Sequence, residues 1–325
     1  MAKLRFVDHA EPGITRRKVR GGKWAYFTPE GERIKDREEI DRLNRIALPP
    51  AYENCWYCPH PHGHLLAIGY DARGRRQYRY HPDWRAERET KKFDLCAQFG
   101  RGLPSLRKRV TDDLASRKLS RERAIASVVA LLDTGAIRIG NEQYARENKS
   151  FGATTLRNRH AKIEKGTLRL RFRGKSGKMH EIDCRDPDLV RCVRKMQDLP
   201  GQHLFQYVDE EGTPTPVQSH DVNEYLHETM GEEFTAKHFR TWTASVLAFG
   251  RLFEEPDVPL KAVLTDVSER LGNTPAIARK SYIHPTIIAA LQKLDGTPPM
   301  PEKLPRATEW LSPQERGLIV FLEST

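Results

Sequence analysis

The pattern of apolar and polar residues changes character along the chain. From about residue 23 to residue 81, short aromatic and apolar runs, such as those at 24–27 and 65–69, alternate with turn residues. Runs of this kind are typical of β-strands. Only residues 36–46 differ, because isoleucine and leucine recur there at helical spacing. The sequence therefore predicts a small β-rich N-terminal domain that contains one helix.

Helical periods dominate from about Glu87 onward. Residues 121–134 carry a broad apolar face, and residues 260–271 carry another that stops at a glycine, a common C-terminal signal of helices. One β-hairpin interrupts this half, because residues 168–173 alternate apolar and arginine side chains before a glycine-rich turn at 174–178. We therefore expect a mainly α-helical domain with an embedded β-hairpin.

The two patterns meet near residues 84–92, and no internal repeat or low-complexity linker separates them. A length of 325 residues suits two domains that each bury an apolar core. The sequence predicts an α+β protein, with a β-rich domain at residues 1–86 and a mainly helical domain at residues 87–325.

The balance of charge favours a polyanionic partner. Lysine and arginine number 55 against 44 acidic residues, which gives a formal net charge of +11 and a pI of about 9.4. Such a surplus is typical of proteins that bind nucleic acid through phosphate contacts, although a merely basic protein shares this composition. No apolar stretch follows Met1, and the apolar run at 317–322 is too short to span a bilayer. We therefore expect a soluble, intracellular protein.

Cysteine use does not indicate disulfide bonds. The five cysteines are an odd number in a long chain, which does not fit a disulfide framework. Cys55 and Cys58 have CxxC spacing and are followed by histidines, so a zinc site is an alternative. No second pair completes the usual ligand set, and Pro59 excludes c-type haem attachment. We expect no metal here, and a turn between strands at 54–58 and 64–70.

A basic and aromatic stretch in the β-rich region is a candidate nucleic-acid surface. Residues 71–81 interleave arginines with tyrosines and one glutamine. Arginine neutralises phosphates, glutamine can hydrogen-bond an adenine edge, and tyrosine can contact a sugar or a base. The alternative is a basic strand whose tyrosines pack on the fold. The candidate residues are Gln77, Tyr78, Arg79 and Tyr80.

Three cations in the second half have surroundings that suit a phosphodiester. Arg138 follows the apolar helix, and Arg240 begins a predicted helix, where backbone amides add positive potential. A guanidinium offers planar donors to phosphate, although such an arginine is more often a buried ion-pair partner. Lys175 lies in the hairpin turn, where most lysines are only solvated but where an ammonium can protonate a leaving oxygen. The Gly-Lys-Ser sequence is no P-loop, because Arg169 stands where that motif needs glycine.

Tyr282 completes the set of candidates. Asn273 and Thr274 cap a predicted helix that Pro275 opens, and Tyr282 follows two turns later. A tyrosine in this position is usually part of a core or its rim, but a phenol can also act as a nucleophile. None of these residues is evidence of catalysis when it is taken alone.

Together, however, these residues and their local sequences resemble the type IB DNA topoisomerases of the small bacterial and poxvirus class. The resemblance covers nearly the whole chain, and so many motifs in one order are specific. It implies the catalytic fold shared by tyrosine recombinases and type IB topoisomerases for the second domain. The stretches that carry it are residues 76–81, 137–142, 144–148, 152–160, 172–178, 237–240 and 271–282.

The resemblance also implies an activity and a set of roles. The protein would relax positive and negative supercoils by cutting, swivelling and rejoining one DNA strand, without ATP, metal or another cofactor. Tyr282 would be the nucleophile that forms a 3′-phosphotyrosyl link. Arg138 and Arg240 would bind the non-bridging phosphate oxygens, and Lys175 would be the general acid. Asn273 stands where poxviral and eukaryotic members have histidine, and it can donate only a neutral hydrogen bond.

The implied partner is duplex DNA, which a monomer would clamp between its two domains, with residues 1–86 as the clamping domain. Such an enzyme is expected to be cytoplasmic and associated with the nucleoid. The residues that the resemblance places against DNA are Gln77, Tyr78, Arg79, Tyr80, Tyr144 and Lys149.

Two other functions remain open at this point. A tyrosine recombinase shares the catalytic residue types, but Lys237 stands where recombinases have the histidine of HxxR, and their N-terminal domain is usually helical. A duplex-DNA-binding protein without catalysis is the other. The segment 294–325 is rich in proline and charge, and residues 308–322 are expected to form a terminal helix of unassigned function.

Overall fold

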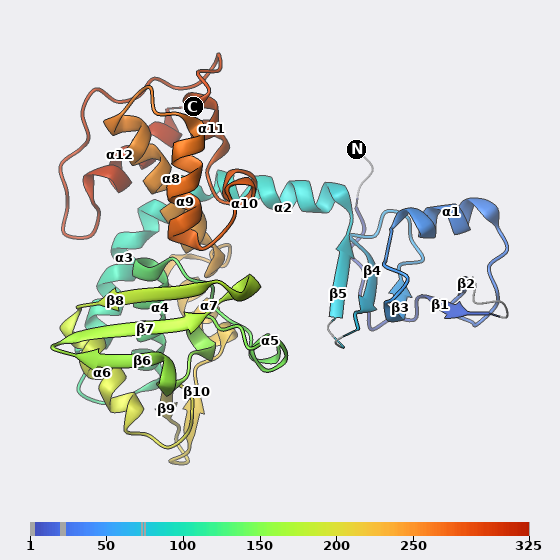
Figure 1. The fold of residues 1–325 in the computed structure, drawn as a ribbon, viewed down its shortest axis with the longest axis horizontal. Coiled ribbons are helices and arrows are strands. Elements are labelled where there is room, and N and C mark those ends of the chain that lie inside the picture. Colours follow the sequence, from blue (N-terminus) through green and yellow to red (C-terminus); the bar gives the residue numbers. More distant parts are fainter. Residues whose placement is uncertain (1–3, 20–23, 73, 75, 325) are drawn as a thin grey trace. The chain divides into compact units, whose positions relative to one another are not determined.

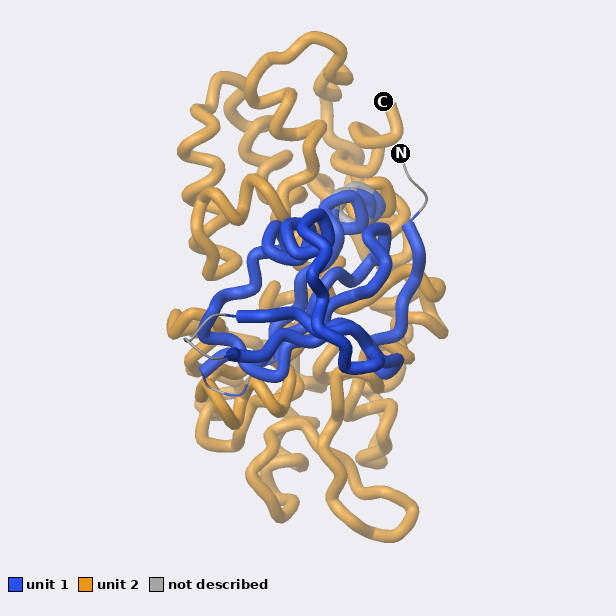
Figure 2. Tube along the Cα trace, turned by 90° about the vertical axis from the view of Figure 1, so that its right-hand side faces the viewer, with its two compact units in different colours: residues 1–91 blue, residues 92–325 orange. Residues whose placement is uncertain are grey.

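The chain forms two compact units, residues 1–91 and residues 92–325, which Figure 2 shows in different colours. The division falls within helix α2, which spans Pro82–Asp94. A five-stranded sheet dominates the first unit, and the second is mainly helical with two smaller sheets (Figure 1), so the predicted α+β class is confirmed. The computed structural model of the chain describes residues 4–19, 24–72, 74 and 76–324.

An antiparallel sheet forms the first unit, with five strands among the residues described there, in the order β2-β1-β3-β4-β5. Its core includes Tyr26, Leu43 and Tyr57, which are contributed by the sheet and by helix α1. The strands predicted at 54–58 and 64–70 are confirmed within one residue at each end. The strands are β1 (Ile14–Lys18), β2 (Trp24–Phe27), β3 (Glu53–Tyr57), β4 (Leu65–Tyr70) and β5 (Arg76–Tyr80).

Helix α1, at Arg37–Arg45, confirms the helix predicted at 36–46. The side chain of Asp36 accepts a hydrogen bond of 3.2 Å from the backbone N–H of Glu38 and so caps the first turn. Acidic residues occupy the first turn and basic residues the last, which suits the helix dipole. Leu43, 1% exposed, ties the helix to the sheet.

The second unit is mainly helical, as predicted. Helices α4 and α9 confirm those expected at 121–134 and 260–271. The helices are α3 (Cys96–Ala115), α4 (Arg121–Gly135), α5 (Glu142–Asn148), α6 (Pro187–Gln197), α7 (Ser219–Met230), α8 (Lys237–Glu254), α9 (Leu260–Leu271), α10 (Pro275–Ser281), α11 (Pro285–Leu291) and α12 (Pro313–Glu323). Short 3₁₀ turns are η1 (Ala153–Thr155), η2 (Asn158–His160) and η3 (Lys175–Gly177), and a small pair of strands is β9 (Gln206–Val208) and β10 (Pro214–Pro216).

The predicted hairpin is confirmed as β7 (Thr167–Arg173) and β8 (Met179–Cys184). Apolar residues of β7 are buried and its arginines are exposed, as the alternation indicated. A third strand, β6 (Ala161–Glu164), pairs with β7 and was not predicted. It is only 4 residues long, too short for its alternation to be recognised.

Helix α4 is the centre of the helical core. Residues 124–129 are all buried, because α3, α6, α7 and α8 pack around this helix. Its C-cap is Ala136, whose φ of 49° is left-handed, and Ala136 is itself buried. This turn directs the chain from the core toward Arg138.

Helix α12 closes the core of this unit. Leu318 and Phe321 are almost completely buried, and α12 packs on α3 and α8. The helix expected at 308–322 begins only at Pro313, because Ser312 and Glu315 form a capping box there.

Glu315 also joins α12 to three other helices. Its carboxylate lies 2.7 Å from Arg107 of α3, and it accepts a hydrogen bond of 3.2 Å from the indole N–H of Trp242 on α8. Arg107 in turn pairs with Asp133 of α4 at 2.7 Å. The polar C-terminal segment is therefore part of the core of the helical unit.

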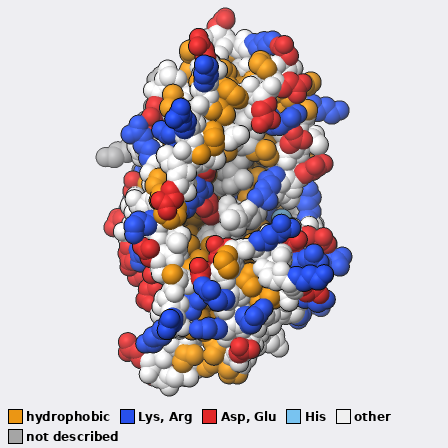
Figure 3. All heavy atoms as spheres, turned by 90° about the vertical axis from the view of Figure 1, so that its left-hand side faces the viewer, with side chains coloured by type: hydrophobic (Ala, Val, Ile, Leu, Met, Phe, Trp, Pro, Cys, Tyr) orange, Lys and Arg blue, Asp and Glu red, His pale blue; other side chains and the backbone are white. Residues whose placement is uncertain are grey.

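No helix among the described residues is long and apolar enough to cross a membrane. The cysteines are all free and buried, and in the described part of the chain no group of three or more acidic, histidine or cysteine side chains is placed to hold a metal. The Sγ atom of Cys58 instead accepts a hydrogen bond of 3.4 Å from the backbone of His60. On the face drawn in Figure 3, basic and acidic side chains are interspersed, so the surplus of positive charge does not form one uniform patch there.

Replacing Glu315 with alanine is expected to lower the free energy of unfolding by about 2–3 kcal/mol, since it removes a helix cap and one partner of a largely buried ion pair. Urea denaturation measures the change. Lys108→Ala is the control, because its pair with Asp112 has side chains that are 66% and 62% exposed, and such pairs contribute about 0.5 kcal/mol. Equal losses in the two variants would contradict the structural role of Glu315.

Candidate active site

Arg138, Arg240 and Asn273 come together at one atom. The side-chain oxygen of Asn273 accepts a hydrogen bond of 2.8 Å from Nη2 of Arg138 and another of 3.2 Å from Nη2 of Arg240. Neither arginine forms a salt bridge with a carboxylate of the described residues, so the ion-pair alternative for both residues is not supported. Two neighbouring guanidinium groups without a counterion form a site for an anion.

Arg240 is held by carbonyl groups at the C-terminal ends of two helices. It lies in the first turns of α8, as predicted, and is 3% exposed. Its guanidinium donates to the carbonyl of Ala136 and, at 3.0 Å, to that of Leu271. These carbonyls belong to the C-terminal ends of α4 and α9, where the helix dipole is negative and favours a cation.

Arg138 is positioned by a close approach of two backbone segments. Its carbonyl accepts a hydrogen bond of 2.8 Å from the N–H of Ala153. A Cβ atom at Gly152 would lie 2.5 Å from the same carbonyl and 2.6 Å from the backbone nitrogen of Gly140. Gly152 therefore has to be glycine for the backbone segment that carries Arg138 to remain in place.

The amide of Asn273 has one end satisfied and one end free. The C-cap of helix α9 is Gly272, whose φ is 63°, and the N–H of Asn273 donates a hydrogen bond of 2.9 Å to the carbonyl of Ser268. Arginine has no acceptor, so the two arginines fix the amide oxygen toward themselves. Its Nδ2 is buried and has no hydrogen-bond partner among the described residues. A buried donor of this kind can bind an acceptor oxygen, such as a phosphate oxygen.

Tyr282 lies directly after α10, which ends at Ser281. The guanidinium carbon of Arg240 lies 4.8 Å from the centre of its ring. Behind it, the hydroxyl of Ser245 on α8 donates to the carbonyl of Tyr282 at 3.4 Å and accepts from the N–H of His284 at 3.0 Å. Helix α8 therefore holds both the ring and the backbone of the tyrosine.

The electrostatics of this cluster favour the phenolate of Tyr282. Burial raises the pKa of the phenol, but the nearby Arg240, together with Arg138 and Lys175, lowers it. The charges prevail, and the pKa of Tyr282 lies below its ordinary value of 10.0. Burial, with the charge of Arg138, lowers the pKa of Arg240, while Tyr282 opposes this shift.

Lys175 lies at the tip of the β7–β8 hairpin and is exposed. The turn places Ser176 and Gly177 at φ values of 61° and 77°. A hydrogen bond of 2.7 Å from the N–H of Gly174 to the carbonyl of Lys178 closes it. Its ammonium contributes to the lowered pKa of Tyr282, so it belongs to the same electrostatic cluster.

The candidate DNA-contacting residues of β5 lie on two faces of that strand. Tyr78 and Tyr80 are 39% and 36% exposed, and their rings stack at 5.9 Å. Gln77 and Arg79 alternate with them and are half-buried, and Gln77 donates to Asp71 at 3.1 Å. The structure therefore does not bring all four to one face. Two arginines of the same stretch, Arg73 and Arg75, lie outside the described residues.

Two further candidates lie in the helical unit. Tyr144 is half-buried on α5, and Lys149 is exposed directly after that helix, with a φ of 50°. Neither forms a hydrogen bond or a ring contact with the arginine–asparagine–tyrosine cluster among the residues described.

Three residues that support this cluster were not predicted: Ser245, Lys178 and His180. Ser245 carries no signal, because a buried serine on a helix is common. Lys178 and His180 follow Lys175 on the hairpin, and their proximity in sequence was the one available indication.

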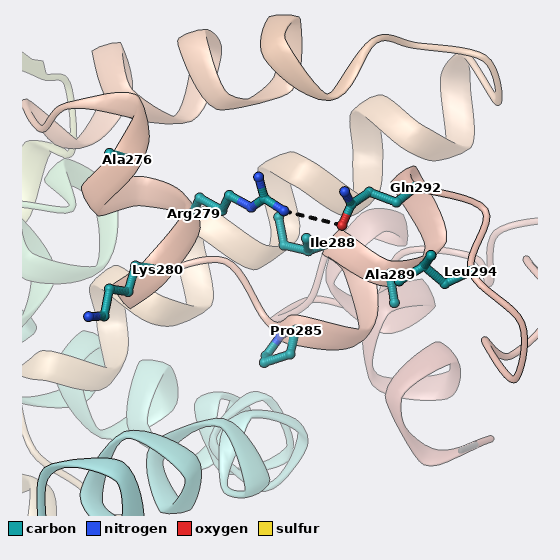
Figure 4. A pocket seen from close by; sticks show the side chains of 8 residues that line it. All are labelled: Ala276, Arg279, Lys280, Pro285, Ile288, Ala289, Gln292 and Leu294. Atoms are coloured by element: carbon teal, nitrogen blue, oxygen red, sulfur yellow. Dashed lines mark hydrogen bonds between the residues drawn. The ribbon is translucent and has the colours of Figure 1, made fainter. Parts of the chain in front are cut away.

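A pocket of about 490 Å³ lies between α10 and α11 (Figure 4). It is mainly apolar, and at its rim Arg279 donates to Gln292 at 3.3 Å. No residue of the arginine–asparagine–tyrosine cluster lines it, so the cluster is not part of this pocket.

Comparisons with known proteins cover both units. Residues 81–284 match the family described as eukaryotic DNA topoisomerase I, catalytic core, and residues 23–71 match bacterial DNA topoisomerase IB, N-terminal domain. A DNA topoisomerase 1B of Acanthamoeba polyphaga mimivirus is 32% identical over 290 residues, which are 85% of this chain and 86% of that protein. A DNA topoisomerase 1B of Vaccinia virus (strain Copenhagen) is 23% identical, over 78% of this chain and 82% of that protein.

Among solved structures, the XerH site-specific recombinase in its pre-cleavage complex with difH has a TM-score of 0.35 and 15% identity, over 55% of this chain and 48% of that chain. The cluster around Tyr282 lies within the segment that matches the catalytic core.

The lowered pKa of Tyr282 can be measured directly. The difference between the ultraviolet titrations of the wild type and Tyr282→Phe is expected to have a midpoint below 10.0. In Arg240→Met the midpoint should rise, because the charge that favours the phenolate is gone. Arg279→Met, an exposed arginine of the same helical segment, should leave it unchanged. A wild-type midpoint at or above 10.0 would show that the surrounding cations do not lower the pKa of Tyr282.

Proposed function

The chain belongs to the type IB DNA topoisomerases, and from this premise we propose that Tyr282, Arg138, Arg240, Lys175 and Asn273 carry out its strand-cleavage chemistry. The observation that carries the proposal is the pair of arginines that meet at the oxygen of Asn273 and have no carboxylate partner among the described residues. Tyr282 lies against one of them.

A type IB topoisomerase relaxes supercoils of either sign by cutting one strand through a 3′-phosphotyrosyl intermediate, letting it swivel and rejoining it. ATP and metal are not required, because the energy of the broken bond is kept in the phosphotyrosyl ester. The recombinase alternative is not favoured, since residues 23–71 match a topoisomerase N-terminal domain.

Tyr282 begins the proposed reaction. Its phenol loses a proton to solvent, and the resulting phenolate oxygen attacks the phosphorus. The bond from phosphorus to the 5′-oxygen then breaks, and that oxygen takes a proton from the ammonium of Lys175. Rejoining is the reverse: the 5′-hydroxyl returns its proton to Lys175 and attacks the phosphotyrosyl ester, which releases Tyr282.

The arginines and Asn273 stabilise the charge that grows on the non-bridging oxygens. Arg138 and Arg240 supply fixed charged donors, and the unused Nδ2 of Asn273 supplies a neutral one. Their arrangement before the substrate binds means that little reorganisation accompanies the reaction. Loss of one such donor typically slows a reaction about 100- to 1000-fold.

Duplex DNA is the substrate of this family, and the way in which the chain holds it is part of the proposal. We propose that residues 1–86 form a clamping domain, that residues 87–325 form the catalytic domain, and that a monomer closes around DNA in the nucleoid. The exposed Tyr78 and Tyr80 would contact DNA from the first domain, together with Gln77 and Arg79, and Tyr144 and Lys149 from the second.

The proposed nucleophile is tested by relaxation of negatively and positively supercoiled plasmid in EDTA without ATP. The wild type is expected to relax both, and Tyr282→Phe neither, because it lacks the attacking oxygen. Tyr207→Phe is the matched control and should retain activity, since Tyr207 lies on β9 and packs against the core. Relaxation by Tyr282→Phe would refute the assignment.

Replacement of Asn273 tests the neutral donor. Asn273→Ala is expected to slow cleavage about 100-fold or more, because it removes a hydrogen bond to the transition state. Asn273→His should retain or modestly raise the rate, since imidazole also donates. Single-turnover cleavage gives the rates, and an alanine variant as fast as the wild type would remove Asn273 from the chemistry.

A further inference from the structure

His180 lies where the loops that carry Lys175 and Asn273 meet. Its ring stacks on Phe172, with a centroid distance of 5.3 Å and an angle of 12°. A Cβ atom at Gly174 would lie 2.6 Å from Cδ2 of His180, and one at Gly272 would lie 2.6 Å from its Cε1. The ring therefore packs directly against both glycine backbones.

Each of these glycines precedes a residue of the proposed site. Gly174 is followed by Lys175, and Gly272 is followed by Asn273. A side chain at either glycine would displace the ring, and Gly272 also has a φ of 63°, which glycine adopts most readily. The imidazole thus fills the space between the general-acid loop and the turn that carries the phosphate donor.

Lys178 makes a second connection between the same loops. Its Nζ donates a hydrogen bond of 2.5 Å to the carbonyl of Asn273. Its own carbonyl accepts from Gly174, as part of the turn that presents Lys175. Lys178 and His180, together called the hairpin latch, join the tip of the hairpin to the end of α9.

The environment of His180 favours the neutral form of its imidazole. Burial lowers the pKa of the imidazole, and so do the charges of Arg138, Arg240 and Lys178. A neutral flat ring can pack between two backbones beside these cations, whereas a fourth cation would be repelled.

We propose that the hairpin latch positions Lys175 for proton transfer to the leaving 5′-oxygen. The inference rests on the proposed role of Lys175. Lys175 is exposed at the tip of a turn, and its own side chain is not packed into the core. The latch supplies the contact that fixes this turn relative to Asn273 and, through Asn273, to both arginines. His180 and Lys178 are positioning residues, because they act through Lys175 and not on the phosphate.

The test compares two leaving groups in single-turnover cleavage. One duplex carries a cleavage site mapped with the wild-type enzyme, and the other has sulfur in place of the bridging 5′-oxygen at that site. A thiolate leaves without a proton, so only the oxygen substrate needs the general acid. His180→Ala is expected to cleave the oxygen substrate about 10- to 100-fold more slowly and the sulfur substrate at nearly the wild-type rate. Lys178→Met should show the same pattern to a smaller extent.

Two further variants separate the possible outcomes. Lys175→Ala should be rescued by sulfur, and its failure to be rescued would refute the role of Lys175 itself. Met179→Ala, an exposed neighbour on β8, should behave like the wild type. Suppose that Lys175→Ala is rescued by sulfur. If the latch variants then cleave both substrates slowly, or cleave both at the wild-type rate, the latch does not position Lys175. Lys178→Met changes an exposed side chain and serves if His180→Ala does not fold.

Discussion

The structure of the site depends on holding two guanidinium groups together, with no carboxylate of the described residues paired to either. Arg138 and Arg240 share one amide oxygen as their common acceptor. Like charges this close repel each other, and the repulsion is relieved when an anion binds. The positive charges of the same two arginines also lower the pKa of Tyr282. Binding of a phosphate and activation of the nucleophile therefore have one electrostatic origin.

Backbone groups of the fold hold the two arginines in place against this repulsion. Arg240 is bound by carbonyls at the C-termini of α4 and α9, and Arg138 is fixed where the backbone passes Gly152. The negative ends of two helices take the place of an acidic residue. A carboxylate there would have neutralised the arginines and competed with DNA, whereas carbonyl dipoles hold a guanidinium and leave its charge available.

Much of the fold could be predicted from the sequence, because the long apolar periods of α4 and α9 and the alternation of β7 are strong signals. The catalytic candidates followed from a family resemblance. What could not be predicted depends on tertiary packing. Strand β6 is too short to show a period, and the start of α12 depends on a cap.

The face of β5 on which each side chain lies, and the buried residues that support the site, could not be predicted either. Gln77 and Tyr78 are adjacent in sequence but point to opposite faces of β5, a distinction that composition does not reveal. The contact of His180 with Gly272 joins residues that only the fold brings together.

The Arg107–Glu315 pair has a consequence for how the molecule assembles. Its partners are separated by 208 residues in sequence, and the closure entropy of so long a loop has to be met before the pair can form. Trp242 binds the same carboxylate from the helix that carries Arg240. Docking of the helix that carries Arg240 is therefore tied to the C-terminal helix α12, so the most distant segment of the helical unit stabilises the element on which the site depends.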